Sequence, residues 1–294
     1  MSQEVVRTSV IIPVYNDPEG LRTTVESLLD QTAEDYEIVI ADNGSTDETR
    51  QVANEFAQDD RVTLVVEDEI QGSYAARNAG IETSKGNILC FIDADMWVDE
   101  DWLERVQDRM RDADIDYLGC DVEIVVTNPT PVARYNRQHG FPIEEYIEAN
   151  QFAPTCCLVT RRGVIEDVGL FDERLISSGD AEFGKRVHDA GYSQYYAPDI
   201  TMYHPARETL RSFLKKYYRI ARGRVQRARY YPELFEMENH PLNPRNFLPI
   251  RPWAVYESHD GSLREFLIVY TILTAVKITT GVGEAREWLW PTRD

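Results

Sequence analysis

The stretch Asn87-Ile88-Leu89-Cys90-Phe91-Ile92, followed directly by Asp93-Ala94-Asp95, decides the fold and points to the site. Its apolar run is typical of a short buried strand, and alternation along an extended segment would point Asp93 and Asp95 the same way. In open α/β sheets, ligands bind in the crevice outside the carboxyl ends of the strands. Paired carboxylates there offer hard oxygen ligands to Mn²⁺ or Mg²⁺ and leave room for phosphate oxygens. The alternative is a solvated turn, because aspartate is a common turn residue.

Three further strand-like runs precede this stretch, at residues 8–15, 36–41 and 62–67. A helical pattern follows each of them. The second helix is expected to be capped by Ser45 or Thr46, and the third is opened by Gly72. Four strand-helix units in about 95 residues predict an α/β fold with a doubly wound, mostly parallel sheet. No Gly-x-Gly-x-x-Gly follows a strand, which argues against a dinucleotide-binding oxidoreductase.

Three more polar residues stand at element ends. Asp42 ends the second strand, where its carboxylate could accept hydrogen bonds from a base or a ribose. Asp180 lies at or before the first turn of a helix whose face is marked by Phe183 and Val187, so an ordinary helix cap is one interpretation. His204 ends another short strand, and a single histidine in that setting is usually structural.

Six segments, in this order and spacing, closely resemble the family 2 glycosyltransferases of GT-A fold. They are Val10-Ile11-Ile12-Pro13-Val14-Tyr15-Asn16, Asp42-Asn43-Gly44-Ser45-Thr46-Asp47, Ala76-Arg77-Asn78-Ala79-Gly80, Asp93-Ala94-Asp95, Gly169-Leu170-Phe171-Asp172-Glu173 and Gly179-Asp180-Ala181-Glu182. The resemblance spans roughly residues 8 to 206. It implies a transferase that moves a sugar from a nucleotide-sugar donor and inverts its anomeric configuration.

The resemblance also implies roles for individual residues. Asp180 would be the catalytic base that takes the proton of an acceptor hydroxyl. The nucleotide-sugar would be bound by Pro13, Tyr15, Asp42, Arg77 and Asp93, with Asp42 at the base and Arg77 near the phosphates. The metal, Mn²⁺ or Mg²⁺, would be held by Asp95, Asp93 and His204, and would neutralise charge on the departing diphosphate. The family more often has Glu-Asp where this chain has Gly179-Asp180, so the neighbouring carboxylate is missing.

The formal charge of −20 is unevenly distributed. Residues 1–206 hold 41 acidic and 16 basic residues, whereas residues 207–294 hold 10 and 15. The acidic part repels nucleic acid, so we expect no nucleic-acid partner. Only 5 of the 31 basic residues are lysine, a balance that resembles proteins of salt-loving cells and predicts a halophilic archaeal source. A requirement for molar salt in folding would support this prediction, and full stability in dilute buffer would contradict it.

The C-terminal part has the pattern of a membrane-associating extension. Nine basic residues and one acidic residue lie between Arg207 and Arg229, interleaved with aromatic and aliphatic residues, so the helix 207–230 suits an anionic membrane surface. Residues 231–261 contain five prolines and predict an irregular connection. Residues 266–282 are apolar but short for a span and are interrupted by Lys277, which favours an amphipathic or re-entrant anchor with Trp288 and Trp290 at the interface. A buried helix closing the domain is the alternative.

The predicted organisation is a catalytic domain over residues 1–206, with a nucleotide-binding half (1–100) and an acceptor half (101–206), and an extension over 207–294. The four cysteines lie in apolar contexts without metal-ligand spacing, and the polar residues 1–8 form no signal peptide, so a cytoplasmic setting is expected. The predicted location is therefore the cytoplasmic face of the cell membrane.

The predicted function is extension of a lipid-linked glycan on dolichol or polyprenyl phosphate, in protein N-glycosylation. Within the class, a polysaccharide or glycolipid transferase and a polyprenyl-phosphate sugar synthase are alternatives. Outside it, a nucleotidyltransferase would need a Gly-rich, basic loop after the first strand, and Pro13-Val14-Tyr15-Asn16 is not such a loop. A non-catalytic carbohydrate-binding protein would need neither the metal carboxylates nor Asp180.

Overall fold

The computed structural model describes residues 8–256 and 262–292. The polar N-terminus and the last part of the proline-rich connection therefore lie outside the described residues. The chain divides into two compact units. The first comprises Met1–Ile124, Phe141–Glu173 and Gly179–Pro205, and the second comprises Val125–Gly140, Arg174–Ser178 and Ala206–Asp294. The second unit thus includes two short segments on the N-terminal side of the predicted boundary at residue 206.

The first unit is built on a mixed sheet whose strand order is β3-β2-β1-β4-β7-β6-β8-β5. Its strands are β1 (Thr8–Val14), β2 (Tyr36–Asp42), β3 (Val62–Val66), β4 (Ile88–Phe91), β5 (Trp97–Val98), β6 (Tyr117–Val125), β7 (Leu158–Arg161) and β8 (Gln194–Pro205). Strands β1 to β4 pair in parallel, while β7 joins β4 and β6 antiparallel and β5 joins β8 antiparallel. A turn of 3₁₀-helix (Thr155–Cys157) directly precedes β7.

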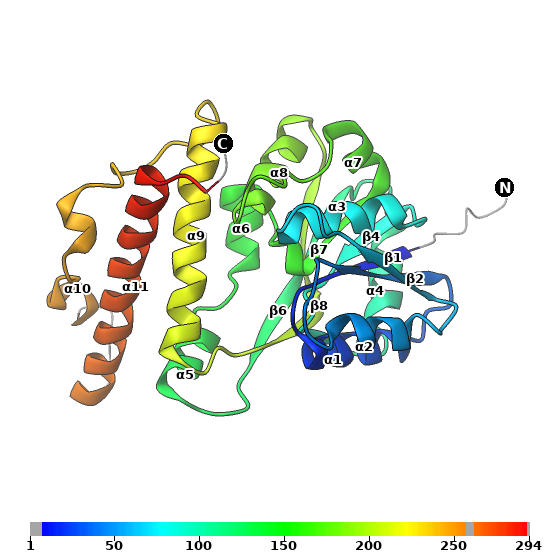
Figure 1. Cartoon of the computed structure of the whole chain (residues 1–294), viewed down its shortest axis with the longest axis horizontal. Coiled ribbons are helices and arrows are strands. Elements are labelled where there is room, and N and C mark those ends of the chain that lie inside the picture. The colour runs from blue at the N-terminus through cyan, green and yellow to red at the C-terminus, as the bar shows by residue number, and fades with distance from the viewer. Residues whose placement is uncertain (1–7, 257–261, 293–294) are drawn as a thin grey trace. The chain divides into compact units, whose positions relative to one another are not determined.

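Helices cover both faces of this sheet. They are α1 (Pro18–Leu29), α2 (Thr49–Phe56), α3 (Ser73–Thr83), α4 (Trp102–Met110), α6 (Ile143–Asn150), α7 (Arg162–Val168) and α8 (Gly179–Asp189). In Figure 1, α1 and α2 lie below strands β1 and β2, and α3 lies above them. Since the strands are covered on both sides, β1 and β2 are continuous apolar runs, with Val10, Ile11 and Ile38 fully buried.

The strand order creates a switch point between β1 and β4. The chain moves outward from β1 to β2 to β3 and then returns to β4 on the far side of β1. Because such crossovers are right-handed, α1 and α2 lie on one face and α3 on the other. The carboxyl ends of β1 and β4 therefore diverge at the position where open α/β sheets bind ligands. Tyr15 follows β1 there, and Asp93 follows β4.

The second unit is helical. It contains α5 (Pro131–Gln138), α9 (Leu210–Tyr230), the 3₁₀-helix η2 (Pro244–Phe247), α10 (Pro252–Tyr256) and α11 (Leu263–Leu289). Phe213 of α9 packs with Val132 and Ile272, and Tyr217 joins the cluster. These two aromatic rings, expected at lipid headgroups, therefore form part of the core of this unit.

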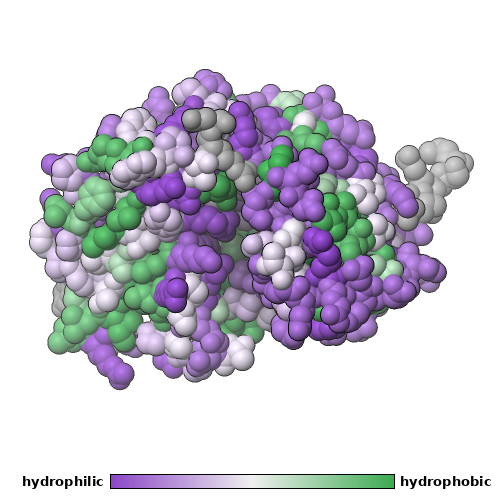
Figure 2. Space-filling view, viewed as in Figure 1, coloured by the Kyte–Doolittle hydropathy of each residue, from purple (hydrophilic) through white to green (hydrophobic). Residues whose placement is uncertain are grey.

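Helix α11 has 27 residues and is longer than the predicted apolar segment. Among the described residues it is the one helix long and apolar enough to cross a membrane, yet only 17% of its most apolar window is buried within the chain. Figure 2 shows hydrophobic surface over the part of the molecule that carries α10 and α11 in Figure 1. Exposed apolar side chains there include Trp253, Leu263 and Leu267.

A buried ionic network joins α11 to α9. The Glu287 carboxylate is fully buried and accepts hydrogen bonds from Arg222 Nε at 2.8 Å, Gln226 Nε2 at 3.1 Å and Thr292 N at 2.9 Å. Burial alone would raise the pKa of Glu287, but hydrogen bonds from Thr292 and Arg222 hold that pKa below its ordinary value of 4.5. The charged form is therefore the one that the folded unit stabilises.

Replacing Glu287 with glutamine should lower the free energy of unfolding at pH 7 by about 1–3 kcal/mol, because charge-assisted bonds are lost in a buried site. Since the folded pKa lies below the unfolded pKa, this stabilisation is present above about pH 4.5 and disappears as the pH falls further. Urea unfolding at several pH values measures both effects. Glu284→Gln on the same helix is the control. Burial raises the pKa of Glu284, so the loss of its charge should not destabilise the folded unit.

Candidate active site

The predicted metal carboxylates lie in a turn at the switch point. Residues 93–96 follow β4 as a turn in which Met96 N donates to Asp93 O at 3.2 Å, so the expected extended geometry is wrong. Burial still alternates: Ala94 and Met96 are buried, whereas Asp93 and Asp95 are partly exposed. Both carboxylates are therefore accessible beside the end of β4.

Helix α1 fixes this turn. Thr24 Oγ1 donates to the Met96 carbonyl at 2.6 Å. A Cβ atom at Gly20 would lie 2.3 Å from the Ala94 carbonyl oxygen, so only glycine allows the turn to pack this closely against α1. Asp17 caps the same end of α1 through its bond from Gly20 N at 3.0 Å. Helix α1 thus positions the turn that carries the carboxylates after β4.

Arg77 of α3 pairs directly with one of these carboxylates. Arg77 Nη2 donates to Asp93 Oδ1 at 2.6 Å, and the Arg77 side chain is only 5% exposed. Arg77 Nε is buried and has no hydrogen-bond partner in the described part of the chain. A buried guanidinium fixed next to a half-exposed carboxylate provides positive charge where phosphate oxygens were expected.

Asp42 is already engaged within the chain. Its side chain is fully buried, with Oδ1 accepting from Ser45 N at 3.1 Å and Oδ2 from Arg50 Nε at 2.7 Å. The two donors expected from a ligand are thus supplied by the loop and by α2. Arg50, which sequence reasoning did not single out, is 41% exposed and presents its remaining N–H groups at the surface.

The loops after β1 and β2 are tied together. Asn16 N donates to Ser45 Oγ at 3.0 Å, and Thr46 N donates to Asn16 Oδ1 at 2.8 Å. Helix α2 begins after Glu48, so the prediction that Ser45 or Thr46 caps it is wrong, because both residues serve this loop contact instead. Pro13 is half-buried beside Ala41, while Tyr15 is 49% exposed.

Asp180 occupies the first turn of α8. Its carboxylate is partly exposed, and Oδ1 accepts from Ala181 N at 3.0 Å. The backbone N–H groups of Gly179 and Asp180 point to the hydroxyl of Tyr74, at 2.8 and 3.3 Å. The residue is thus fixed at the N-terminus of α8.

His204 is not gathered with the two aspartates into a ready cluster. In the described ranges no group of three or more His, Cys, Asp and Glu side chains could hold a metal. His204 is 6% exposed, its Nδ1 lies 2.7 Å from the Pro205 carbonyl, and its ring lies 5.5 Å from that of Phe141. Trp97 and Tyr203 are register partners whose rings stack, and His204, the next residue along β8, is buried on the other side of that strand.

Asp93 and Asp95 thus offer two partly exposed carboxylates after β4. This set fits a divalent cation, because Mg²⁺ and similar ions are commonly held by one or two carboxylates with phosphate oxygens completing the shell. Asp93 Oδ1 lies beside Arg77 at the carboxyl end of β4, which is the end of a strand where open α/β sheets bind ligands.

Other motif residues build the scaffold of the site. Asn78 Nδ2 donates to the Phe171 carbonyl at 2.9 Å, and Asn78 Oδ1 accepts from Phe171 N at 3.1 Å, which locks two segments 93 residues apart. Glu182 is fully buried in a double contact with Arg186, at 2.6 and 3.0 Å. Arg186 lies four residues after Glu182 on the same helix, whereas Phe171 lies too far along the chain from Asn78 for a local pattern to reveal the contact.

Comparison with known proteins agrees on one family. The family model described as glycosyl transferase family 2 matches residues 9–169. A glycosyltransferase of Haloferax volcanii, AglE, is 41% identical over 222 residues, which cover 74% of this chain and 73% of that protein. A pre-mycofactocin glycosyltransferase of Mycobacterium tuberculosis is 28% identical over 222 residues, covering 71% of this chain and 44% of its own length.

Solved structures show the same fold. The mannosyltransferase PcManGT of Pyrobaculum calidifontis, in complex with GDP-Man and Mn²⁺, has a TM-score of 0.66 at 21% identity, covering 98% of this chain and 88% of that one. TarS 1-349 of S. aureus, in complex with UDP-GlcNAc, has a TM-score of 0.56 at 16% identity, covering 96% and 92%. These matches confirm the predicted GT-A-like fold.

Proposed function

Because the chain belongs to glycosyl transferase family 2 and is a glycosyltransferase, we propose that it moves a sugar from a nucleotide-sugar donor to a lipid-linked acceptor at a membrane surface. One observation carries the donor half of the proposal. Asp93 and Asp95 stand half-exposed at the switch point between β1 and β4, next to the buried Arg77 guanidinium. A nucleoside diphosphate would bind at this position in an open α/β sheet. Carboxylates are suitable ligands for the divalent cation that would accompany it.

In the proposed reaction, the acceptor hydroxyl attacks the anomeric carbon while the bond from that carbon to the diphosphate oxygen breaks, which inverts the configuration. Asp180 takes the proton of the hydroxyl. Asp93 and Asp95 would hold Mn²⁺ or Mg²⁺, which stabilises the charge of the leaving diphosphate. Arg77 keeps Asp93 oriented and adds positive charge there. The Mn²⁺ in the related mannosyltransferase structure supports the cation, and the donors in the two related structures support the nucleotide-sugar.

The lipid-linked acceptor and the membrane surface are supported by the second unit. Arg211, Lys215 and Arg219 are exposed at four-residue intervals on α9 and form one basic face. Trp253, Leu263 and Trp290 are exposed at 59%, 73% and 65%. The amphipathic rings of the two tryptophans favour the headgroup region of a membrane. Such a surface fits an anionic membrane that α11 contacts from one side, on the cytoplasmic face.

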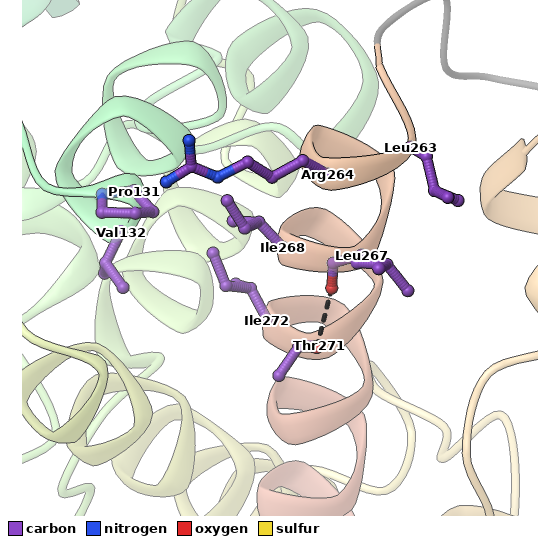
Figure 3. Close-up of a pocket in the computed structure, with 8 residues that line it drawn as sticks. All are labelled: Pro131, Val132, Leu263, Arg264, Leu267, Ile268, Thr271 and Ile272. Carbon is purple, nitrogen blue, oxygen red and sulfur yellow. Dashed lines mark hydrogen bonds between the residues drawn. The ribbon is translucent and has the colours of Figure 1, made fainter.

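A groove of about 770 Å³ next to α11 adds an apolar contact surface for lipid. In Figure 3, Ile268 and Ile272 point toward Val132 of α5, and the Arg264 side chain extends over the same space. Leu267 projects away from Val132. The groove suits the chain of a polyprenyl lipid, with Arg264 able to pair with its phosphate. The finer assignment, to dolichol-linked glycans of protein N-glycosylation in a halophilic archaeon, rests on the acidic, lysine-poor composition.

The experiment is a panel of nucleotide sugars incubated with the protein, Mn²⁺ and a polyprenyl-phosphate-linked acceptor in liposomes. A glycosyltransferase of this kind releases a nucleoside diphosphate only when the acceptor is present, and the lipid gains one sugar in its mass. A nucleotidyltransferase would instead need a nucleoside triphosphate and a sugar 1-phosphate and would release pyrophosphate from the triphosphate, so a parallel incubation with those two reactants identifies it. A carbohydrate-binding protein would release neither product. Turnover with a soluble polysaccharide acceptor but none with the lipid acceptor would contradict the proposed lipid acceptor. It would still agree with the assignment as a glycosyltransferase.

A further inference from the structure

Tyr74 is a buried residue of the first unit that has no assigned role. It is the second residue of α3 and is 4% exposed. Its ring stacks on Phe171, with 5.8 Å between the ring centroids. Burying a tyrosine hydroxyl is unfavourable unless the hydroxyl has hydrogen-bond partners, so its partners show what it does.

The Tyr74 hydroxyl caps α8. It accepts from Gly179 N at 2.8 Å and from Asp180 N at 3.3 Å, across more than 100 residues of sequence. The first N–H groups of a helix have no partner within that helix, so an oxygen from another element fixes both the place and the direction of the first turn. Here that turn carries Asp180.

The glycine at position 179 is explained by the same contact. A Cβ atom there would lie 2.8 Å from two carbons of the Tyr74 ring, which is closer than such atoms come in proteins. A side chain at 179 and the Tyr74 ring therefore exclude each other.

Tyr74 also contacts the donor side of the site. The Arg77 guanidinium carbon lies 5.7 Å from the centre of the Tyr74 ring, and Arg77 donates to Asp93 at 2.6 Å. One continuous set of contacts thus runs from Asp93 through Arg77 and Tyr74 to Asp180. All four residues belong to the first unit.

We propose that Tyr74 is a positioning residue that holds Asp180 at a fixed place relative to Asp93 and Asp95 by capping α8. This inference rests on the proposed role of Asp180 as base. Loss of the hydroxyl frees the first turn of α8 and misplaces the base, but it leaves Arg77 and the donor carboxylates in place. The expected consequence is a lower kcat with unchanged donor binding, because proton transfer depends steeply on geometry.

The test is Tyr74→Phe, which keeps the ring and removes only the cap. We expect kcat to fall about tenfold, which corresponds to the loss of roughly one hydrogen bond in the transition state. The donor Kd should stay within about twofold of the wild-type value. In Tyr74→Phe/Asp180→Asn, turnover should equal that of Asp180→Asn alone, since Tyr74 acts through Asp180. The control is Tyr192→Phe, whose hydroxyl bonds Asp167 at the surface at 3.1 Å and which should behave as wild type.

Hydrogen exchange of the Gly179 and Asp180 amides gives a readout that needs no substrate. Exchange should accelerate about tenfold in Tyr74→Phe and stay unchanged in Tyr192→Phe. Unchanged exchange, additive losses in the double variant, or an equal fall in donor affinity would each overturn the proposal. A wild-type protein that consumes no nucleotide sugar would contradict the proposed function, while the exchange result would still decide whether Tyr74 caps α8.

Discussion

Replacing Asp180 with asparagine should lower kcat by about 10²–10⁴-fold and leave donor affinity within about twofold, because the amide keeps the shape of the side chain but cannot accept the acceptor's proton. The residue stands half-exposed in the first turn of α8, so an acceptor can reach it. The measurements are the initial rate of nucleoside diphosphate release with acceptor present and the donor Kd from calorimetry.

The matched control is Asp189→Asn, at the last residue of the same helix. Asp189 forms an exposed ion pair with Lys185, and such pairs contribute little to the stability of a fold. Turnover should therefore stay within about twofold of wild type. Near-normal turnover of Asp180→Asn would contradict the base role. It would instead point to an acceptor that is already ionised at neutral pH, such as a lipid phosphate.

Replacing Asp95 with asparagine should weaken metal-dependent donor binding by more than roughly 100-fold, because loss of even an outer-shell partner of a metal ligand typically costs 10–100-fold. Folding should be little affected, since the side chain is partly exposed. Asp93→Asn should also weaken donor binding, and it should destabilise the fold as well. The reason is that Arg77, 5% exposed, would lose its ionised partner.

Donor titrations at fixed Mn²⁺ and thermal unfolding without ligand separate the two effects. Asp101→Asn is the control, because Asp101 makes an exposed ion pair with Arg105 a few residues away. If Asp95→Asn bound the donor normally in Mn²⁺, Asp95 would not be a metal ligand. If Asp93→Asn were as stable as wild type, the contact with Arg77 would not support the fold.

The order of strands and helices in the first 100 residues could be predicted because local patterns determine it. Runs such as Val10-Ile11-Ile12 are apolar at every position since helices cover both faces of the sheet. The positions of Asp93, Asp95 and Asp180 at element ends followed from the same patterns. The sequence alone could not predict how distant segments are aligned in space. That alignment determines which side chains contact each other.

Three residues show this limit. Arg50, in the first turn of α2, donates to the buried Asp42, and no pattern in the sequence indicated that this carboxylate would be paired within the chain. His204 is buried next to Phe141, 63 residues earlier in the chain, and no local pattern encodes that contact. Tyr74 reaches α8 from more than 100 residues away. Likewise, α9 carries a basic, aromatic sequence, yet Phe213 is used for packing inside the second unit.

The most direct test of the account is calorimetry of a nucleoside diphosphate with the wild type and with Asp93→Asn/Asp95→Asn, each in Mn²⁺ and in EDTA. The account predicts saturable binding only for the wild type in Mn²⁺, with GDP and UDP both tried because the related structures hold guanine and uracil donors. Equal binding by the double variant in Mn²⁺, or equal binding by the wild type in EDTA, would contradict it.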